Sequence, residues 1–143
     1  MSKKKNTKKP FKRVPQGRTL STKDNYIGKN KTKSTKERPV VVIEADDENN
    51  LAIVILSSRK GANRTQLKNY QQGQSYFKHF VEIEDNEGRP IRVNKKFREN
   101  HKNQDVSQLD VLKIKDTVLN HSKPMQENQR KIDKFRGKKN PRD

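Results

Sequence analysis

The chain contains no cysteine and no tryptophan among its 143 residues. The absence of thiols excludes disulfide bonds, thiolate catalysis and thiolate-bound zinc. Apolar residues are also scarce, since 27% of the chain is hydrophobic while 36% is charged. A chain with so few apolar groups cannot offset the entropy that it loses on ordering. We therefore expect one small folded domain with disordered ends.

Long apolar runs are missing as well. No stretch approaches the roughly 20 apolar residues that cross a bilayer, and the opening MSKKKNTKKPFKRVP lacks the apolar segment of a secretory signal. We therefore expect a cytoplasmic protein without a membrane segment. The histidines, His79, His101 and His121, lack the spacing of metal ligands. Because no glycine-rich phosphate loop occurs either, we expect no metal site and no cofactor.

Positive charge is the property in excess, with a net charge of +18. Such a charge attracts polyanions, so single-stranded RNA or DNA is the expected partner. The charge is uneven: residues 1–38 carry 14 Lys and Arg against two acids, residues 39–115 carry 13 against 11, and residues 116–143 carry eight against four. We accordingly expect three regions. They are a basic disordered arm at 1–37, a folded domain at 38–121, and a basic tail at 122–143 with a short helix around 125–136.

Two apolar runs open the folded region. Val40–Ile43 and Leu51–Leu56 are rich in β-branched residues, which is typical of strands buried on both faces. Turn-forming residues, including the acids at 46–48, lie between the runs and predict a hairpin. Residues 79–93 predict a second hairpin, because apolar and polar residues alternate on both sides of the sequence DNEG.

Residues 105–121 change to a helical period. Ser107 followed by Asp110 resembles a capping box. Three leucines (Leu109, Leu112, Leu119) lie beside Val111, Ile114 and Val118 and give a broad apolar face. We expect one helix here that closes a small sheet; the alternative is a strand through Val111–Lys115, because VLKIK also alternates. The fold class is therefore mainly β, a small bent sheet or partly open barrel, and its small core would favour a homodimer.

An arginine and two serines are best suited to chemistry. Arg38 begins the first strand and Ser57 and Ser58 end the second, so a tight hairpin would bring these ends together. An arginine fork and a hydroxyl on one phosphate could stabilise a pentavalent phosphorane while the RNA 2′-OH attacks. The alternative is that Arg38 belongs to the basic arm and the serines only end a strand, and residue chemistry alone favours that alternative.

The loop RKGANRTQLKNYQQGQ and the strand after it mix cations with aromatic rings. Cations meet phosphates and rings stack on bases in proteins that bind single strands. The candidate binding residues are Arg59, Lys60, Arg64, Lys68, Tyr70, Tyr76 and Lys78. Binding and structural roles stay open for both tyrosines, and Phe80 is assigned to the core.

Three segments in order, RPVVVI at 38–43, AIVILSS at 52–58 and KHFVEI at 78–83, resemble the MazF/PemK family of toxin–antitoxin endoribonucleases. The resemblance covers roughly residues 37–93. It implies an SH3-like barrel, usually dimeric, that cuts single-stranded RNA without metal and is neutralised by an antitoxin protein. It places catalytic roles on Arg38 and on Ser57, or Ser58 with a shift of one residue, and sets His79 near the RNA path. The family's opening strand is not recognisable, because a lysine-rich segment takes its place.

Two functions follow from these patterns. The first is an RNA-binding, metal-independent endoribonuclease. The alternative is a non-catalytic accessory protein that holds nucleic acid with basic arms around a small barrel. A ribosome-associated basic protein also fits the charge.

Overall fold

The computed structural model describes residues 14–28, 36–68, 70, 76–93, 98–99, 105–121 and 124–137. The strands are β2 (Thr19–Lys23), β3 (Glu37–Ala45), β4 (Asn50–Ser57), β5 (Arg64–Gln66), β6 (Tyr76–Glu82), β7 (Ile91–Arg92) and β8 (Arg98–Glu99). The helical segments are the short turn η1 (Asp24–Tyr26), α1 (Gln108–Asp116), the π-helical turn η2 (Thr117–His121) and α2 (Met125–Gly137).

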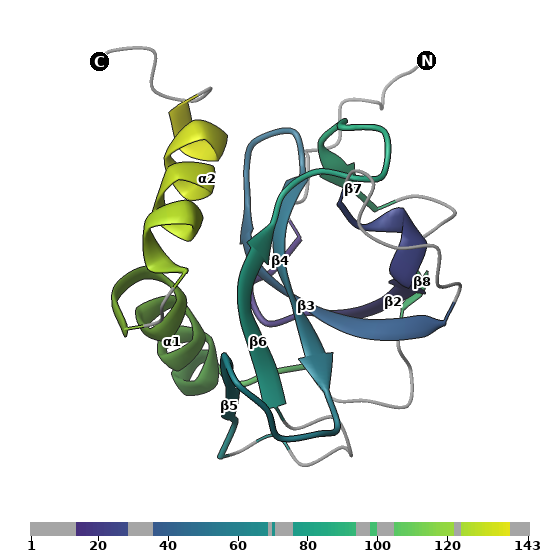
Figure 1. Ribbon diagram of the computed structural model, residues 1–143. Coiled ribbons are helices and arrows are strands. Elements are labelled where there is room, and N and C mark those ends of the chain that lie inside the picture. Colours follow the sequence, from purple (N-terminus) through teal and green to yellow (C-terminus); the bar gives the residue numbers. More distant parts are fainter. Residues whose placement is uncertain are drawn as a thin grey trace, which may run out of the picture.

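The strands form one antiparallel sheet in the order β5-β6-β4-β3-β2-β8, and β7 pairs with β4 (Figure 1). No described pairing joins the end strands β5 and β8, so within these ranges the sheet is open. Helices α1 and α2 lie together on one side of it (Figure 1). The fold is therefore mainly β, as expected. None of the helices in the described ranges has the length and apolar character needed to cross a membrane.

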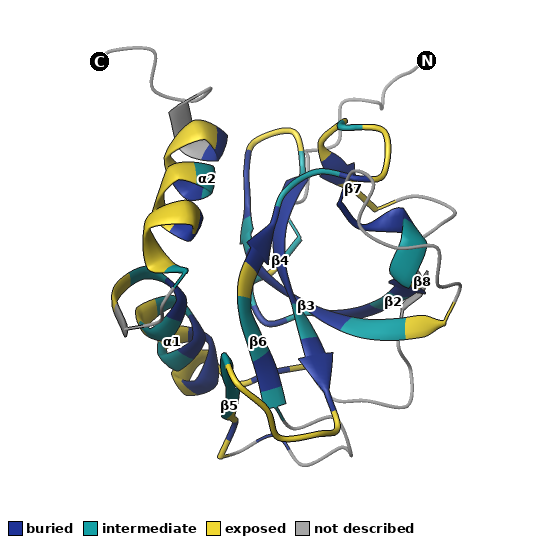
Figure 2. Ribbon diagram, in the orientation of Figure 1, coloured by how far each residue is buried: buried dark blue, intermediate teal, exposed yellow. Residues whose placement is uncertain are grey.

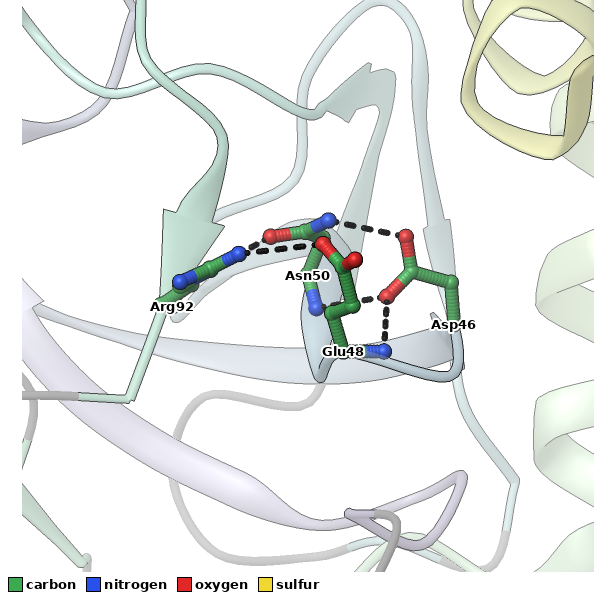
Figure 3. A network of polar contacts seen from close by, with 4 residues as sticks. All are labelled: Asp46, Glu48, Asn50 and Arg92. Atoms are coloured by element: carbon green, nitrogen blue, oxygen red, sulfur yellow. Dashed lines mark hydrogen bonds and ion pairs between the residues drawn. The ribbon is translucent and has the colours of Figure 1, made fainter. Parts of the chain in front are cut away.

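The β3–β4 hairpin is confirmed, and Asp46 holds its turn. The Asp46 carboxylate accepts hydrogen bonds from the backbone N–H groups of Glu48 and Asn50 and from the Asn50 side chain, each at 2.9 Å (Figure 3). Arg92 donates to Asn50 Oδ1 at 2.6 Å and pairs with Glu48 at 3.2 Å, so the turn also anchors β7. The acids at 46–48 therefore build a turn, as their position predicted.

Strand β2 shows that the expectation of a disordered arm over residues 1–37 was wrong for residues 14–28. β2 pairs with β3 over five residues, from Thr19↔Val41 to Lys23↔Glu37. Leu20 is buried, and so are the two apolar residues that follow the strand, Tyr26 and Ile27. Without β2 the apolar strand β3 would expose an edge of unpaired backbone groups. Residues 1–13 and 29–35 of the expected arm lie outside the described residues.

The central strands are buried on both faces, as their continuous apolar runs predicted (Figure 2). Alternate side chains point to opposite faces of a strand. Val41 and Val54 belong to the core cluster under the helices, whereas Val40 and Ile53 belong to the cluster under β2 and η1. The sheet therefore separates two small cores.

Helix α1 confirms the helical interpretation, so the alternative of a strand through residues 111–115 was wrong. Ser107 caps the helix by accepting a hydrogen bond from the Asp110 N–H at 3.2 Å. Val111, Ile114 and Val118 are buried against the sheet. Leu109 and Leu112, however, are 72% and 62% exposed. The buried face is narrower than predicted, because these leucines lie on the neighbouring, solvent-facing side of the helix.

Helix α2 belongs to the folded domain, so the predicted domain boundary at 122 was wrong. Ile132 and Phe135 are buried, but the residue that docks the helix is Asn128. Its side chain donates to the carbonyl oxygens of His79 at 2.6 Å and Val118 at 2.9 Å. It accepts from the N–H of Val81 at 3.0 Å. The Asn128 amide therefore pairs with the edge of β6 beyond the point where β5 ends.

The second predicted hairpin is confirmed only at its turn. Asp85 accepts hydrogen bonds from the N–H groups of Glu87 and Arg89 at 2.8 and 3.0 Å, and Ile91 donates to Ile83 at 3.2 Å. The returning strand β7 then pairs with β4 and not with β6. β6 and β7 therefore share one edge of β4, and the chain bends away from the sheet between them.

Candidate nucleic-acid interface

A cleft of about 330 Å³ opens on the β2 side of the sheet, and we call it the β4–β6 cleft. Ile55 of β4 lies in it beside Lys78, Phe80 and Glu82, which share one face of β6 because alternate strand residues point the same way. The other lining residues are Asp24 and Ile27 near η1 and Ala62, Asn63 and Arg64 in the loop that enters β5. The cleft therefore combines an apolar floor with cations and carboxylates.

Arg38 and Ser57 do not meet as the hairpin predicted. The β3–β4 ladder ends at Val40↔Ile55, two residues before them. Beyond that point β3 stays paired with β2 and β4 stays paired with β6, so the two strands separate (Figure 1). The β4–β6 cleft opens beside this separation. Arg38 and Ser57 each contact a different residue that lines the cleft.

The partner of Arg38 is Asp24. The Arg38 Nε donates to Asp24 Oδ2 at 3.2 Å, and Asp24 lines the cleft. An arginine has five N–H donors, and the contacts within the described ranges use only Nε. The terminal nitrogens therefore remain available for an anion.

The partner of Ser57 is Arg64. The buried Ser57 Oγ accepts from the backbone N–H of Arg59 at 3.2 Å and from Arg64 Nη1 at 3.3 Å. Both contacts use the oxygen as acceptor, so its proton is left to donate. Arg64 Nη1 also donates to the Arg59 carbonyl at 3.2 Å, which holds the guanidinium beside Ser57. Ser58, the alternative by a shift of one residue, is exposed.

The predicted cations divide into two groups. Arg64 and Lys78 lie in the β4–β6 cleft. Arg59, Lys60 and Lys68 are exposed and do not line it. The structure therefore brings together two of the five predicted basic residues.

Two aromatic residues, Tyr70 and Phe80, differ from their places among the predicted binding and core residues. Tyr70 is 1% exposed and belongs to the core under the helices, so it cannot stack on a base. Tyr76 is half-buried and pairs with Ser57 in the β4–β6 ladder. Phe80, which had been assigned to the core, is 40% exposed and lines the cleft. The alternation that places Phe80 on one face with Glu82, away from Val81, was the signal that could have identified it.

His79 faces the helices and not the cleft, because it shares the face of Phe77 and Val81. Its Nε2 contacts Thr65 Oγ1 at 2.7 Å, and its ring centroid lies 5.7 Å from that of Phe77. The buried Nδ1 has no hydrogen-bond partner among the described residues. Burial lowers the pKa of His79 below its ordinary value of 6.5. His79 therefore does not line the β4–β6 cleft, and its place on the RNA path stays a prediction.

The lowered pKa of His79 predicts a pH-dependent stability. Between the folded pKa and 6.5, the unfolded chain binds more protons at this site than the folded chain. Stability therefore falls as the pH drops through that window. Urea unfolding of the parent and of His79→Gln, at about pH 7.5 and about pH 5.5, should show a larger loss on acidification for the parent. Equal losses in both proteins would contradict the assignment.

No group of three or more His, Asp or Glu side chains that could hold a metal ion occurs within the described ranges. Comparison with protein-family models, with curated proteins and with solved structures finds no match to this chain. The function therefore has to be inferred from the cleft itself.

Proposed function

We propose that the chain binds single-stranded RNA in the β4–β6 cleft. The observation that carries the proposal is the half-exposed ring of Phe80, which lines the cleft together with Lys78 and Arg64. An exposed ring between cations suits an unpaired nucleotide, because the base stacks on the ring while the phosphates meet the charges. The net charge of +18 adds long-range attraction for such a strand.

The carboxylates in the cleft favour RNA over DNA. Asp24 and Glu82 line the cleft with the cations. An ionised carboxylate only accepts hydrogen bonds. The ribose 2′-OH is a donor that DNA lacks, so these acids can recognise RNA while they repel poorly placed phosphates.

Cleavage of the bound strand is the second candidate function. The three segments that resemble the MazF/PemK family lie on β3, β4 and β6, which are neighbours in the sheet. This order supports an SH3-like architecture for the sheet, and the resemblance gives the catalytic roles to Arg38 and Ser57. The Arg38 guanidinium lies beside Asp24 on one side of the separation between β3 and β4. The Arg64 guanidinium lies beside Ser57 on the other side.

The chemistry needs no metal ion because RNA carries its own nucleophile. The 2′-oxygen attacks the adjacent phosphorus, its proton passes to the Asp24 carboxylate, and the bond from phosphorus to the 5′-oxygen breaks. The departing oxygen takes a proton from water, which gives a 2′,3′-cyclic phosphate and a 5′-hydroxyl. Arg38 and Arg64 stabilise the charge of the phosphorane, and the Ser57 hydroxyl orients the phosphate.

Phe80→Ala tests the binding proposal. Loss of the ring should weaken binding of a short labelled single-stranded RNA about tenfold, because one stacked base contributes about 1–3 kcal/mol. Fluorescence anisotropy measures the change. The matched control is Leu112→Ala, which removes an exposed apolar side chain from α1 outside the cleft and should leave the affinity unchanged. Phe80→Trp keeps an aromatic face and should retain the affinity. If Phe80→Ala bound the RNA as tightly as Phe80→Trp and the parent, the ring would have no stacking role.

A further inference from the structure

Two further hollows lie next to the β4–β6 cleft, along the chain that follows β6. The cleft shares Glu82 with a hollow of about 410 Å³ between this segment and α2. That hollow shares Ile83, Glu84 and Lys134 with a third, of about 210 Å³, which reaches Asp46 in the β3–β4 turn. Because neighbouring hollows share lining residues, they lie next to one another, and we call the part beyond Glu82 the α2 groove.

The two walls of the α2 groove carry opposite charges. Helix α2 contributes Arg130, Lys131 and Lys134, whose spacing places them on one side of the helix. The facing chain contributes Glu82 and Glu84. Lys131 is already engaged, since its Nζ donates to the Val81 carbonyl at 2.9 Å and lies 3.9 Å from Glu82 Oε1. Arg130 is held by Glu127 on its own helix.

Glu84 and Lys134 are the pair that points to a ligand. Each lines both hollows of the groove. Within the described ranges neither side chain makes a hydrogen bond or an ion pair. The Glu84 carboxylate and the Lys134 ammonium therefore line the same hollows without contacting each other. An occupant of that space would therefore meet an acceptor on one wall and a cation on the other.

A polynucleotide strand has this pattern of groups. Its phosphates complement the ammonium of Lys134 and the guanidinium of Arg130, and its base edges carry donors for the carboxylate of Glu84. A carboxylate offers two acceptor oxygens and no donor. Guanine presents two adjacent donors, N1–H and the N2 amino group, and therefore fits bidentately. Uracil presents a single N3–H between two carbonyl oxygens, which the carboxylate repels.

We infer that the α2 groove binds the nucleotides that flank the base stacked on Phe80, and that Glu84 selects guanine at one of these positions. The inference rests on the proposed function, because the same strand occupies the cleft and the groove. Four residues of extended chain separate Phe80 from Glu84, which corresponds to about 13 Å. The cleft and the groove together are therefore long enough for more than one nucleotide.

The test measures binding of labelled single-stranded RNAs of equal length by fluorescence anisotropy, with the intactness of each RNA checked on a gel. One strand is all uracil, and in the others a single guanine moves along the uracil strand. The parent should bind one of these guanine strands about tenfold tighter than the all-uracil strand. Glu84→Gln should reduce this preference to about twofold or less, mainly because the guanine strand loses affinity. The all-uracil strand should bind at least as tightly as it binds the parent, because the carboxylate that repels the uracil oxygens is gone.

Lys134→Gln should act differently from Glu84→Gln. It should weaken binding of every strand by a similar factor and lower the salt dependence of log Kd by about one unit, because it removes a phosphate contact. The matched controls are Asp133→Asn, an exposed carboxylate on α2 that lines none of the hollows, and Lys113→Gln on α1. Neither control should change affinity or base preference.

The outcomes separate the inference from the function on which it rests. If the parent binds RNA but shows no guanine preference, or if Glu84→Gln keeps the full preference of the parent, Glu84 does not select guanine. If Lys134→Gln also keeps the affinity, the groove is not part of the RNA path and the cleft remains. If the parent binds no single-stranded RNA at all, both proposals are overturned. A loss of affinity in Phe80→Ala together with loss of base preference in Glu84→Gln supports both.

Discussion

Arg38→Ala is expected to slow metal-free cleavage of single-stranded RNA by at least about 100-fold, the effect of removing one group that stabilises transition-state charge. Affinity for RNA should change only a few-fold, because Arg64 and Lys78 still line the cleft. The difference arises because the phosphorane carries more negative charge than the bound phosphate, so a guanidinium contributes more to the transition state than to binding. Loss of turnover without loss of binding is the signature of a catalytic arginine.

The measurement is incubation of the purified chain with a long single-stranded RNA in EDTA, followed by a denaturing gel. Arg38→Lys is the informative second variant, because lysine keeps the charge but loses the planar fork, and it should also be strongly impaired. Arg89→Ala is the matched control, since Arg89 is exposed in the turn before β7, pairs with Glu87 and does not line the cleft. It should cut as fast as the parent.

Asp24 has to be examined together with Arg38, since the two side chains form an ion pair at 3.2 Å. Asp24→Asn removes the proposed proton acceptor but keeps the size of the side chain. If Asp24 takes the proton from the 2′-OH, this variant should be slow while Arg38 remains in place. If Asp24 only orients Arg38, the variant should retain most of its turnover.

Other results would favour the non-catalytic alternative. Intact RNA with the parent, together with a salt-sensitive gel shift, would make the cleft a binding site and remove the catalytic roles of Arg38 and Ser57. Equal cutting by the parent and Arg38→Ala would show that the cleavage does not depend on this arginine.

The sequence predicted the central elements well because their apolar patterns are unambiguous. The continuous β-branched runs gave β3 and β4, the acids between them gave the turn, and Ser107 gave the start of α1. β2 was missed because the five residues TLSTK carry only one apolar side chain and lie among lysines. β2 is stabilised by its pairing with β3. Such pairing with a distant strand cannot be recognised from the five residues of β2 themselves.

The candidate site was harder to predict, because it depends on where strands separate. The sequence placed Arg38 and Ser57 at the ends of one hairpin, but it did not show that the ladder stops at Val40↔Ile55. Tyr70 shows the same limit, because nothing in the sequence around it indicated that it is buried. Phe80 differs, because the alternation along β6 did indicate its exposed face.

Asn128 is the residue for which we expect the largest loss of stability. It is 0% exposed, and its amide makes three hydrogen bonds with the backbone of His79, Val81 and Val118. Asn128→Leu has a similar size but leaves two buried carbonyl oxygens and one N–H without this partner. Because an unsatisfied buried group costs about 1–3 kcal/mol, we expect a loss of at least about 3 kcal/mol, which for a domain of this size lowers Tm by roughly 10 °C or more.

The neighbouring Gln129 provides the control, because it lies on the exposed side of the same helix and bonds only Asp133 among the described residues. Gln129→Leu should change stability by no more than about 0.5 kcal/mol. Thermal and urea unfolding of both leucine variants measure the difference. If Asn128→Leu and Gln129→Leu unfolded at the same temperature, the apolar packing of Ile132 and Phe135 alone would be enough to dock α2. If only Asn128→Leu melts early, the amide is needed to satisfy the β6 edge, and the helix that carries Lys134 is positioned by that pairing.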